Sequence, residues 1–299
     1  QFNDTAHAAS LFGLQEFGNI YTRIMNPTCD VLEQRMAELV GGAAGLAVAS
    51  GQPASAYSIQ NLARAGDNIV SSSHLYGGTY NQFKNNLKEM GIEVRFVDPT
   101  DPENFEKATD DKTRAYFAET LPNPKLHVFP ISEVAEIGRK HDIPLIVDNT
   151  AAPVLCRPFD HGAAITTYST TKYIGGHGTT IGGLIVDGGN FDWGKAGADR
   201  QPAMNTPDPC YGGVVWDEQV TKNMGLPFAY LLKLRTTLLR DLGGAMSPFN
   251  AWMFIQGLET LPLRMREHAK NAQAVAEALA ANKKVQSVTY PGLFEGAEK

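Results

Sequence analysis

The chain has 299 residues, 43% of them hydrophobic and 19% charged, which is enough to bury the core of one large domain or two ordinary ones. The formal net charge of -6 and the lack of a basic tract argue against nucleic-acid binding, because neutralising phosphates requires clustered Lys and Arg. No apolar run approaches the roughly 18 residues of a membrane span, and the 3 widely spaced cysteines predict neither a disulfide framework nor a zinc site. We therefore predict a globular protein of the cytoplasm.

Short apolar runs alternate with longer amphipathic segments from about residue 43 onward. Strands are predicted at 46–49, 68–71, 93–97, 115–118, 144–147, 165–168 and 183–186, and helices at 31–40, 54–65, 79–90, 131–140 and 230–242. Strands separated by helices predict an α/β protein with a mostly parallel, doubly wound sheet and helices on both faces. In such sheets ligands bind beyond the carboxyl ends of the strands.

The last third of the chain is less regular. The segment 188–219, rich in Gly and Pro, is predicted to be a long irregular loop, followed by a helix that starts at Ser247. A further helix at 261–282 and a strand at 285–290 are predicted to begin a second domain. The expected division is an N-terminal arm and first helix at 1–42, a cofactor-binding domain at 43–258, and the beginning of a truncated, smaller α+β domain at 259–299.

The strongest local pattern is the decapeptide 169–178, Ser-Thr-Thr-Lys-Tyr-Ile-Gly-Gly-His-Gly, which follows a predicted strand. Lys172 lies among small residues and could bond covalently to an aldehyde cofactor once its ammonium loses a proton. The hydroxyls of Ser169 and Thr171 could hold a phosphate beside it, and the glycines would let the backbone approach a ligand. The alternative is a surface lysine that follows a polar turn.

Four other candidates follow predicted strands. Asp148 ends the most apolar one and could accept a hydrogen bond from a protonated pyridine nitrogen, or it could cap a turn. Gly51 and Gln52 open a helix whose free amides would bind a phosphate. Tyr76 could stack on a flat cofactor, or it could be an ordinary core or rim tyrosine. No GxGxxG or GxxxxGK[ST] pattern occurs, which argues against dinucleotide and nucleoside-triphosphate sites.

Tyr21 and Arg23 lie on a segment ahead of the first predicted helix. The planar fork of an arginine suits a phosphate, and the alternative is an arm that ties subunits together. Asn123, in the sequence Glu-Thr-Leu-Pro-Asn-Pro at 119–124, offers an amide donor, although turn formation alone would explain an Asn-Pro pair. The 7 histidines show no metal-ligand spacing, and neither HExxH nor GxSxG occurs, so no metal site or hydrolase elbow is predicted.

Together these residues resemble the cysteine and methionine metabolism family of pyridoxal-phosphate enzymes, which have fold type I. The resemblance extends from Asn3 to Gly292 and includes the Lys172 decapeptide, the 18–28 segment and the 188–219 insertion. It implies pyridoxal 5'-phosphate as the cofactor, bound to Lys172, which also shuttles protons. It further implies that Asp148 pairs with the pyridine nitrogen and that Tyr76 stacks on the ring and assists catalysis.

The resemblance also implies a phosphate site and an oligomer. Its phosphate contacts would be Gly51, Gln52, Ser169 and Thr171, with Tyr21 and Arg23 supplied to a neighbouring subunit, so that the protein is at least a dimer and is expected to be a homotetramer. Asn123 would lie beside the cofactor oxygen and the substrate carboxylate. Position 52 is commonly Met in relatives, which leaves a backbone contact unaffected.

The activity that the resemblance implies is a γ-replacement in methionine biosynthesis and trans-sulfuration. O-acetyl-L-homoserine and sulfide would give L-homocysteine and acetate. The alternatives are a methionine γ-lyase or cystathionine γ-synthase type of activity on the same cofactor site, or an assembly that binds the cofactor without turnover. The family's substrate-carboxylate arginine is expected beyond Lys299, because Arg264 and Arg266 do not match its motif.

Overall fold

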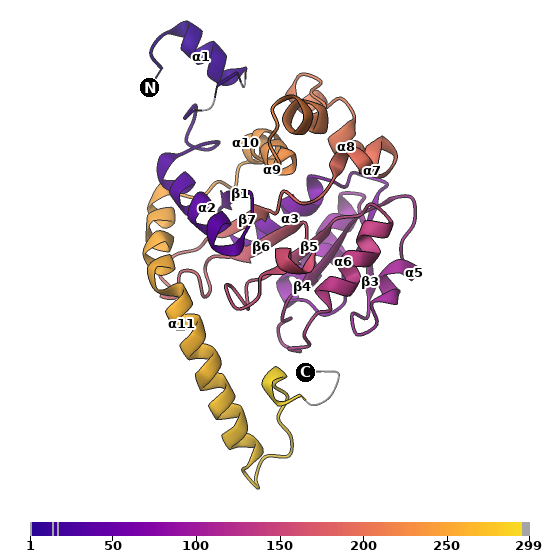
Figure 1. The fold of residues 1–299 in the computed structure, drawn as a ribbon, viewed down its shortest axis with the longest axis vertical. Coiled ribbons are helices and arrows are strands. Elements are labelled where there is room, and N and C mark those ends of the chain that lie inside the picture. The colour runs from indigo at the N-terminus through magenta and orange to yellow at the C-terminus, as the bar shows by residue number, and fades with distance from the viewer. Residues whose placement is uncertain (1, 14, 17, 295–299) are drawn as a thin grey trace.

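The computed structural model describes residues 2–13, 15–16 and 18–294, and it contains a 7-stranded sheet in the order β1-β7-β6-β5-β4-β2-β3 (Figure 1). The strands are β1 Ala44–Val48, β2 Asn68–Ser72, β3 Glu93–Val97, β4 Thr113–Glu119, β5 Leu145–Asp148, β6 Ile165–Ser169 and β7 Gly183–Asp187. Strands β2 to β6 pair in parallel, whereas β7 is antiparallel to both β6 and β1. The seven strands predicted between residues 46 and 186 and the mostly parallel α/β sheet are confirmed.

Helices cover both faces of this sheet, as the burial of successive residues along β2, β4 and β7 requires. The α-helices are α1 Thr5–Phe12, α2 Pro27–Val40, α3 Gly51–Gln60, α4 Gly77–Asn81, α5 Glu103–Lys107, α6 Ile131–Lys140, α7 Trp193–Arg200, α8 Pro202–Asn205, α9 Ala229–Leu234, α10 Arg240–Leu242 and α11 Pro248–Ala280. Shorter or wider helical turns are η1 Gln82–Leu87, η2 Pro158–His161, η3 Pro209–Tyr211, η4 Asp217–Asn223, η5 Arg235–Leu239 and η6 Pro291–Leu293.

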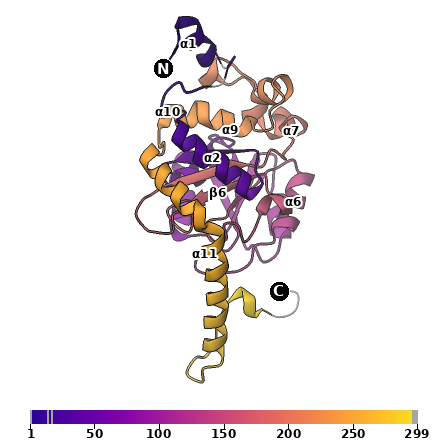
Figure 2. The same ribbon diagram turned by 60° about the vertical axis from the view of Figure 1, so that its left-hand side comes forward.

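Each face of the sheet has its own core. Leu46, Phe117 and Ile185 pack on one face with α3 and with the helices that follow β7. On the other face, α2 and α11 cover β1, β6 and β7, and α5 and α6 cover β2, β4 and β5 (Figures 1 and 2). The sequence starts α2 by clear local signals, because the Asn26 side chain accepts hydrogen bonds from its first turn and Pro27 opens it.

The prediction of an irregular loop at 188–219 is partly wrong, because this segment contains α7, α8, η3 and the start of η4. Asp192 caps α7 by accepting a hydrogen bond from Lys195, and prolines open α8 and η3. Helices of three to eight residues are too short to show a helical period, so composition alone suggested a loop.

The predicted strand at 285–290 is wrong: these residues pair with no strand of the described chain. An apolar alternation forms a strand only where a neighbour takes up its backbone hydrogen bonds, and none lies beside this segment. The helix predicted at 261–282 is part of α11, a single helix of 33 residues that begins at Pro248. The expected boundary at 258/259 therefore falls inside α11, whose C-terminal half projects beyond the sheet (Figure 2).

Candidate active site

A cavity of about 760 Å³ lies at the carboxyl ends of β2, β4, β5 and β6 and at the N-terminus of α3. Eight of the ten predicted site residues line it, namely Gly51, Gln52, Tyr76, Asn123, Asp148, Ser169, Thr171 and Lys172. They are brought together because parallel neighbouring strands end at the same edge of the sheet.

One wall of the cavity is the start of α3. The first amides of a helix have no partner within it, so those of Gly51 and Gln52 are available to an anion. A Cβ at Gly51 would lie 2.8 Å from the Cβ of Ser169, which is why a glycine is required here. The Gln52 side chain donates to the Thr79 hydroxyl at 3.3 Å, so Gln52 would contact an anion through its backbone amide.

Lys172 stands on a tight turn after β6. Its N–H donates to the Ser169 carbonyl at 3.2 Å, and its carbonyl accepts from Gly176 at 2.8 Å. Beside it, the Thr171 hydroxyl already exchanges two hydrogen bonds with the backbone of Gly182, at 3.1 and 3.2 Å. Of the two predicted hydroxyls, that of Ser169 is therefore the better placed to bind a ligand.

Two carboxyl groups share the floor of the cavity. Asp148 and Glu119 are direct partners in the register of β4 and β5. Asp148 accepts a hydrogen bond from the Thr150 N–H at 2.9 Å, and burial nevertheless raises the pKa of Asp148. Burial and the charge of Asp148 raise the pKa of Glu119 to about 8. Glu119 was not predicted as a site residue. The feature that could have identified it is its position at the end of β4, a strand whose residues are all buried.

The turn that carries Lys172 is held from outside by α11. Arg264 donates to the backbone carbonyls of Tyr173, Ile174 and Gly257 at 2.7 to 3.3 Å, and it lines the cavity together with His268. Neither residue is among the site residues predicted from the sequence. Only the folded chain shows that they belong to the site, because they lie about 90 residues from the turn that they contact.

Tyr21 and Arg23 are the two predicted residues that do not reach this cavity. They lie beside 245–248, with the Arg23 guanidinium 5.1 Å from the centre of the Tyr21 ring. The Tyr21 side chain is 57% exposed. Within a single chain, therefore, neither residue takes part in the site around Lys172.

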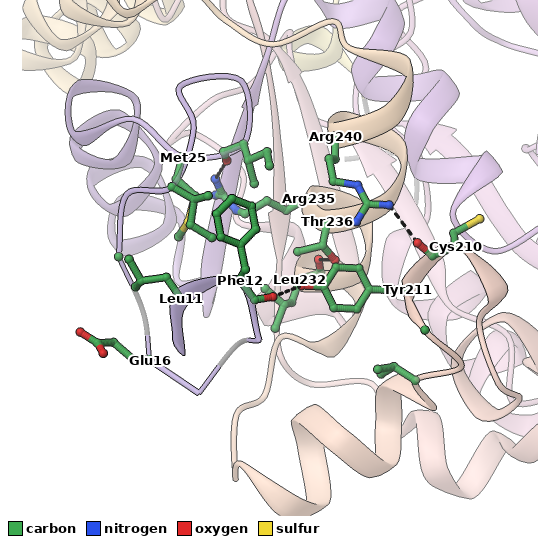
Figure 3. Close-up of a pocket in the computed structure, with 15 residues that line it drawn as sticks. Leu11, Phe12, Glu16, Met25, Cys210, Tyr211, Leu232, Arg235, Thr236 and Arg240 are labelled. Carbon is green, nitrogen blue, oxygen red and sulfur yellow. Dashed lines mark hydrogen bonds between the residues drawn. The ribbon is translucent and has the colours of Figure 1, made fainter. Parts of the chain in front are cut away.

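A second cavity, of about 460 Å³, lies between the N-terminal segment and the helices after β7 (Figure 3). In it Arg240 donates to the Cys210 carbonyl at 2.9 Å, and the Tyr211 hydroxyl donates to the Phe12 carbonyl at 3.3 Å. None of the ten predicted residues lines it. The side chains of Arg235, Arg240 and Tyr211 in this cavity are already engaged with backbone carbonyls.

Two further findings concern the described part of the chain as a whole. No three His, Cys, Asp or Glu side chains within it are grouped so that they could hold a metal ion. None of its helices combines the length and the apolar composition needed to cross a membrane.

Comparison with known proteins gives a consistent set of matches. The profile of the family described as Cys/Met metabolism PLP-dependent enzyme matches residues 1–298. O-acetyl-L-homoserine sulfhydrylase of Leptospira meyeri is 53% identical over 296 residues, covering 98% of this chain and 66% of that protein. Homocysteine/cysteine synthase of Kluyveromyces lactis is 49% identical over 294 residues, covering 98% and 65%.

A solved structure from Campylobacter jejuni, assigned to an O-acetylhomoserine (thiol)-lyase, superposes with a TM-score of 0.92 at 40% identity, covering 99% of this chain and 72% of that one. That structure contains N'-pyridoxyl-lysine-5'-monophosphate. The chain spans about two thirds of the length of the curated relatives it matches, 66% and 65%.

Proposed function

Because this chain belongs to the Cys/Met metabolism family of PLP-dependent enzymes, we propose that it binds pyridoxal 5'-phosphate around Lys172 and catalyses a γ-replacement. The proposed reaction converts O-acetyl-L-homoserine and sulfide to L-homocysteine and acetate. The observation that carries the proposal is the single cavity in which a lysine, a buried aspartate and a helix N-terminus meet.

The residues present fit this cofactor. The amides at the start of α3 would hold the phosphate, helped by the hydroxyl of Ser169, and Gly51 leaves the space that a Cβ would fill. Asp148, at the end of β5, would pair with the pyridine nitrogen, and the Tyr76 side chain, which is 49% exposed, is free to cover the ring. When bound, pyridoxal phosphate withdraws electrons from the substrate and makes the protons beside its amine acidic.

The chain's own residues would then move protons and orient the substrate. Lys172 is the proposed general base for the Cα proton, because its amine lies in the same cavity as Asp148 and Tyr76. Lys172 would also take the proton from Cβ. Loss of this second proton would allow acetate to leave from Cγ, after which sulfide would add at Cγ. Tyr76 is the proposed helper in these transfers, and Asn123 would orient the substrate carboxylate.

The substrate is the first thing to test. We expect the purified protein, supplied with pyridoxal phosphate, O-acetylhomoserine and sulfide, to release homocysteine and acetate in equal amounts, as the names of its relatives suggest. Parallel reactions with cysteine as the sulfur donor and with methionine alone serve as controls. Methionine cleavage without use of sulfide would contradict the proposed reaction and favour a γ-lyase.

The second proposal concerns assembly. We infer that Tyr21 and Arg23 complete the phosphate site of a neighbouring subunit, because they are exposed and lie outside their own cavity. This requires at least a homodimer, and we propose a homotetramer that works in the cytoplasm.

We also propose that the residues from 259 onward belong to a smaller second domain, with 1–42 as an arm and first helix and 43–258 as the cofactor-binding domain.

Arg23→Ala tests the shared site. We expect the dissociation constant of pyridoxal phosphate to rise about 10-fold, since a charge-assisted hydrogen bond to phosphate is lost, while the molar mass in light scattering is unchanged. Lys88→Ala, which removes an exposed cation outside both cavities, is the control. An Arg23→Ala protein that binds the cofactor as tightly as the wild type would contradict the inference.

A further inference from the structure

Glu119 is a buried carboxyl that no part of the proposed reaction uses. It is the last residue of β4, it is 7% exposed, and it lines the cavity around Lys172. A carboxyl group in such a place is costly to bury unless it is hydrogen-bonded and its charge is compensated or removed. The groups that surround Glu119 in this cavity must therefore compensate for the burial of its carboxyl group.

The hydrogen bonds of Glu119 run to the two loops that flank β4. Its Oε1 accepts from the backbone N–H of Tyr76 at 2.6 Å, and its Oε2 accepts from the backbone N–H of Asn123 at 3.4 Å. Tyr76 comes directly before α4, and Asn123 follows β4 by four residues. One carboxyl thus ties together the backbone of both residues that are proposed to cover the ring and orient the substrate.

Burial and the neighbouring Asp148 favour the neutral form of Glu119 and outweigh the two backbone hydrogen bonds, which lower its pKa. The titratable side chains that share the cavity with it are Asp148 from β5, Lys172 and Tyr173 from the turn after β6, Tyr76 ahead of α4, and Arg264 and His268 from α11. The Arg264 guanidinium is engaged with backbone carbonyls of the lysine turn and of α11. Burial and the negative charge of Asp148 raise the pKa of Glu119 from 4.5 to about 8.

We propose that Glu119 is a positioning residue of this site and that it acts as a neutral carboxylic acid. It holds the backbone of Tyr76 and Asn123 over the cavity and leaves the negative charge on Asp148. Two adjacent carboxylates would repel each other, so a shared buried site keeps one of them protonated. The inference rests on the proposed function, because it assigns Glu119 to the same cofactor site.

The test compares Glu119→Gln with Glu119→Ala in the cofactor-loaded protein. Glutamine keeps a neutral group and an oxygen for the Tyr76 N–H, so we expect its cofactor dissociation constant to stay within about 3-fold of wild type. Alanine leaves two backbone N–H groups without their partner, and we expect a rise of about 10-fold or more. The pH at which the visible absorbance of the bound cofactor is half changed should be the same in Glu119→Gln as in wild type, because this substitution removes no charge.

Two readouts independent of activity bear on the protonation state. The wild-type infrared spectrum at pH 7 should contain a protonated carboxylic-acid band that Glu119→Gln lacks. In the protein without cofactor, an acid whose folded pKa lies above its unfolded value favours the folded state most at low pH. Wild-type stability should therefore fall relative to Glu119→Gln as pH rises from about 4.5 to about 8.

Asp187→Asn is the matched control. Asp187 is a buried carboxyl at the end of β7 that lies outside the cavity, and burial raises its pKa to about 7. We expect this control to change stability with pH but to leave cofactor affinity and absorbance unchanged.

Several outcomes would overturn the inference. A Glu119→Gln protein whose absorbance midpoint shifts by about a unit would show that a negative charge had been lost. An alanine variant that binds the cofactor as tightly as wild type would show that nothing was positioned. If wild type shows no cofactor absorbance that depends on Lys172, the proposed function fails first; if it does and the Glu119 variants match it, the inference alone fails.

Discussion

Lys172→Ala is expected to remove the visible absorbance of the bound cofactor and to lower kcat by about three to four orders of magnitude. In the proposed function the lysine would supply both the covalent attachment of the cofactor and the general base, and general acid–base catalysis alone contributes about 10²- to 10⁴-fold. The variant should still fold, because the Lys172 side chain is exposed and its turn is held by backbone hydrogen bonds. Absorbance titration and initial rates of homocysteine formation measure the two effects.

Lys195→Ala is the control for this experiment. Lys195 is an exposed lysine of α7 that pairs with Asp142 at 2.8 Å, outside the cavity. We expect its absorbance and rate to match those of wild type. A Lys172→Ala protein with wild-type absorbance would show that another group holds the cofactor, and the proposed function would have to be abandoned.

Glu33→Ala is expected to lower the free energy of unfolding by about 3–5 kcal/mol, because it leaves a largely buried arginine without its counter-charge. Glu33 is 3% exposed and pairs with Arg235 of η5 at 2.5 Å. Its other oxygen accepts from the Ala47 N–H in β1 at 2.7 Å. Arg235 also donates to the Ile24 carbonyl at 2.7 Å, so this one pair joins α2, β1, η5 and the N-terminal segment.

Urea denaturation of the protein without cofactor measures this loss. Glu38→Ala, an exposed glutamate of the same helix, should change stability by no more than about 0.5 kcal/mol. The double variant Glu33→Ala/Arg235→Met should lose less than the sum of its single variants, because neither charge is then left alone. A loss below about 1 kcal/mol in Glu33→Ala would contradict the buried-pair interpretation.

The strands and most of the site could be predicted from the sequence because both follow from local patterns. Apolar runs of four to seven residues mark strands that are covered on both faces, and polar residues directly after them must lie at one edge of a parallel sheet. Asp148, Tyr76 and Lys172 were found in this way, and the structure brings them into one cavity. What each of them does there stays a proposal.

Other features depend on residues far apart in the sequence, and these were either missed or predicted wrongly. The strand predicted at 285–290 does not form, because a strand exists only where a neighbour completes its hydrogen bonds. Arg264 reaches the lysine turn across about 90 residues of sequence, and no local pattern records that contact. Tyr21 and Arg23 look like phosphate ligands in the sequence but lie outside the cavity around Lys172.

Short, contiguous sequence patterns encode an α/β protein with a lysine, an aspartate and a helix that starts at a glycine, all at the carboxyl ends of its strands. Which charged groups meet depends on the folded chain. It places Glu119 opposite Asp148 and joins Glu33 to Arg235. Burial then changes the proton affinity of Glu119 and the stability that rests on Glu33. The physical reason is that burial and charge pairing are properties of the space around a residue, which only the folded chain defines.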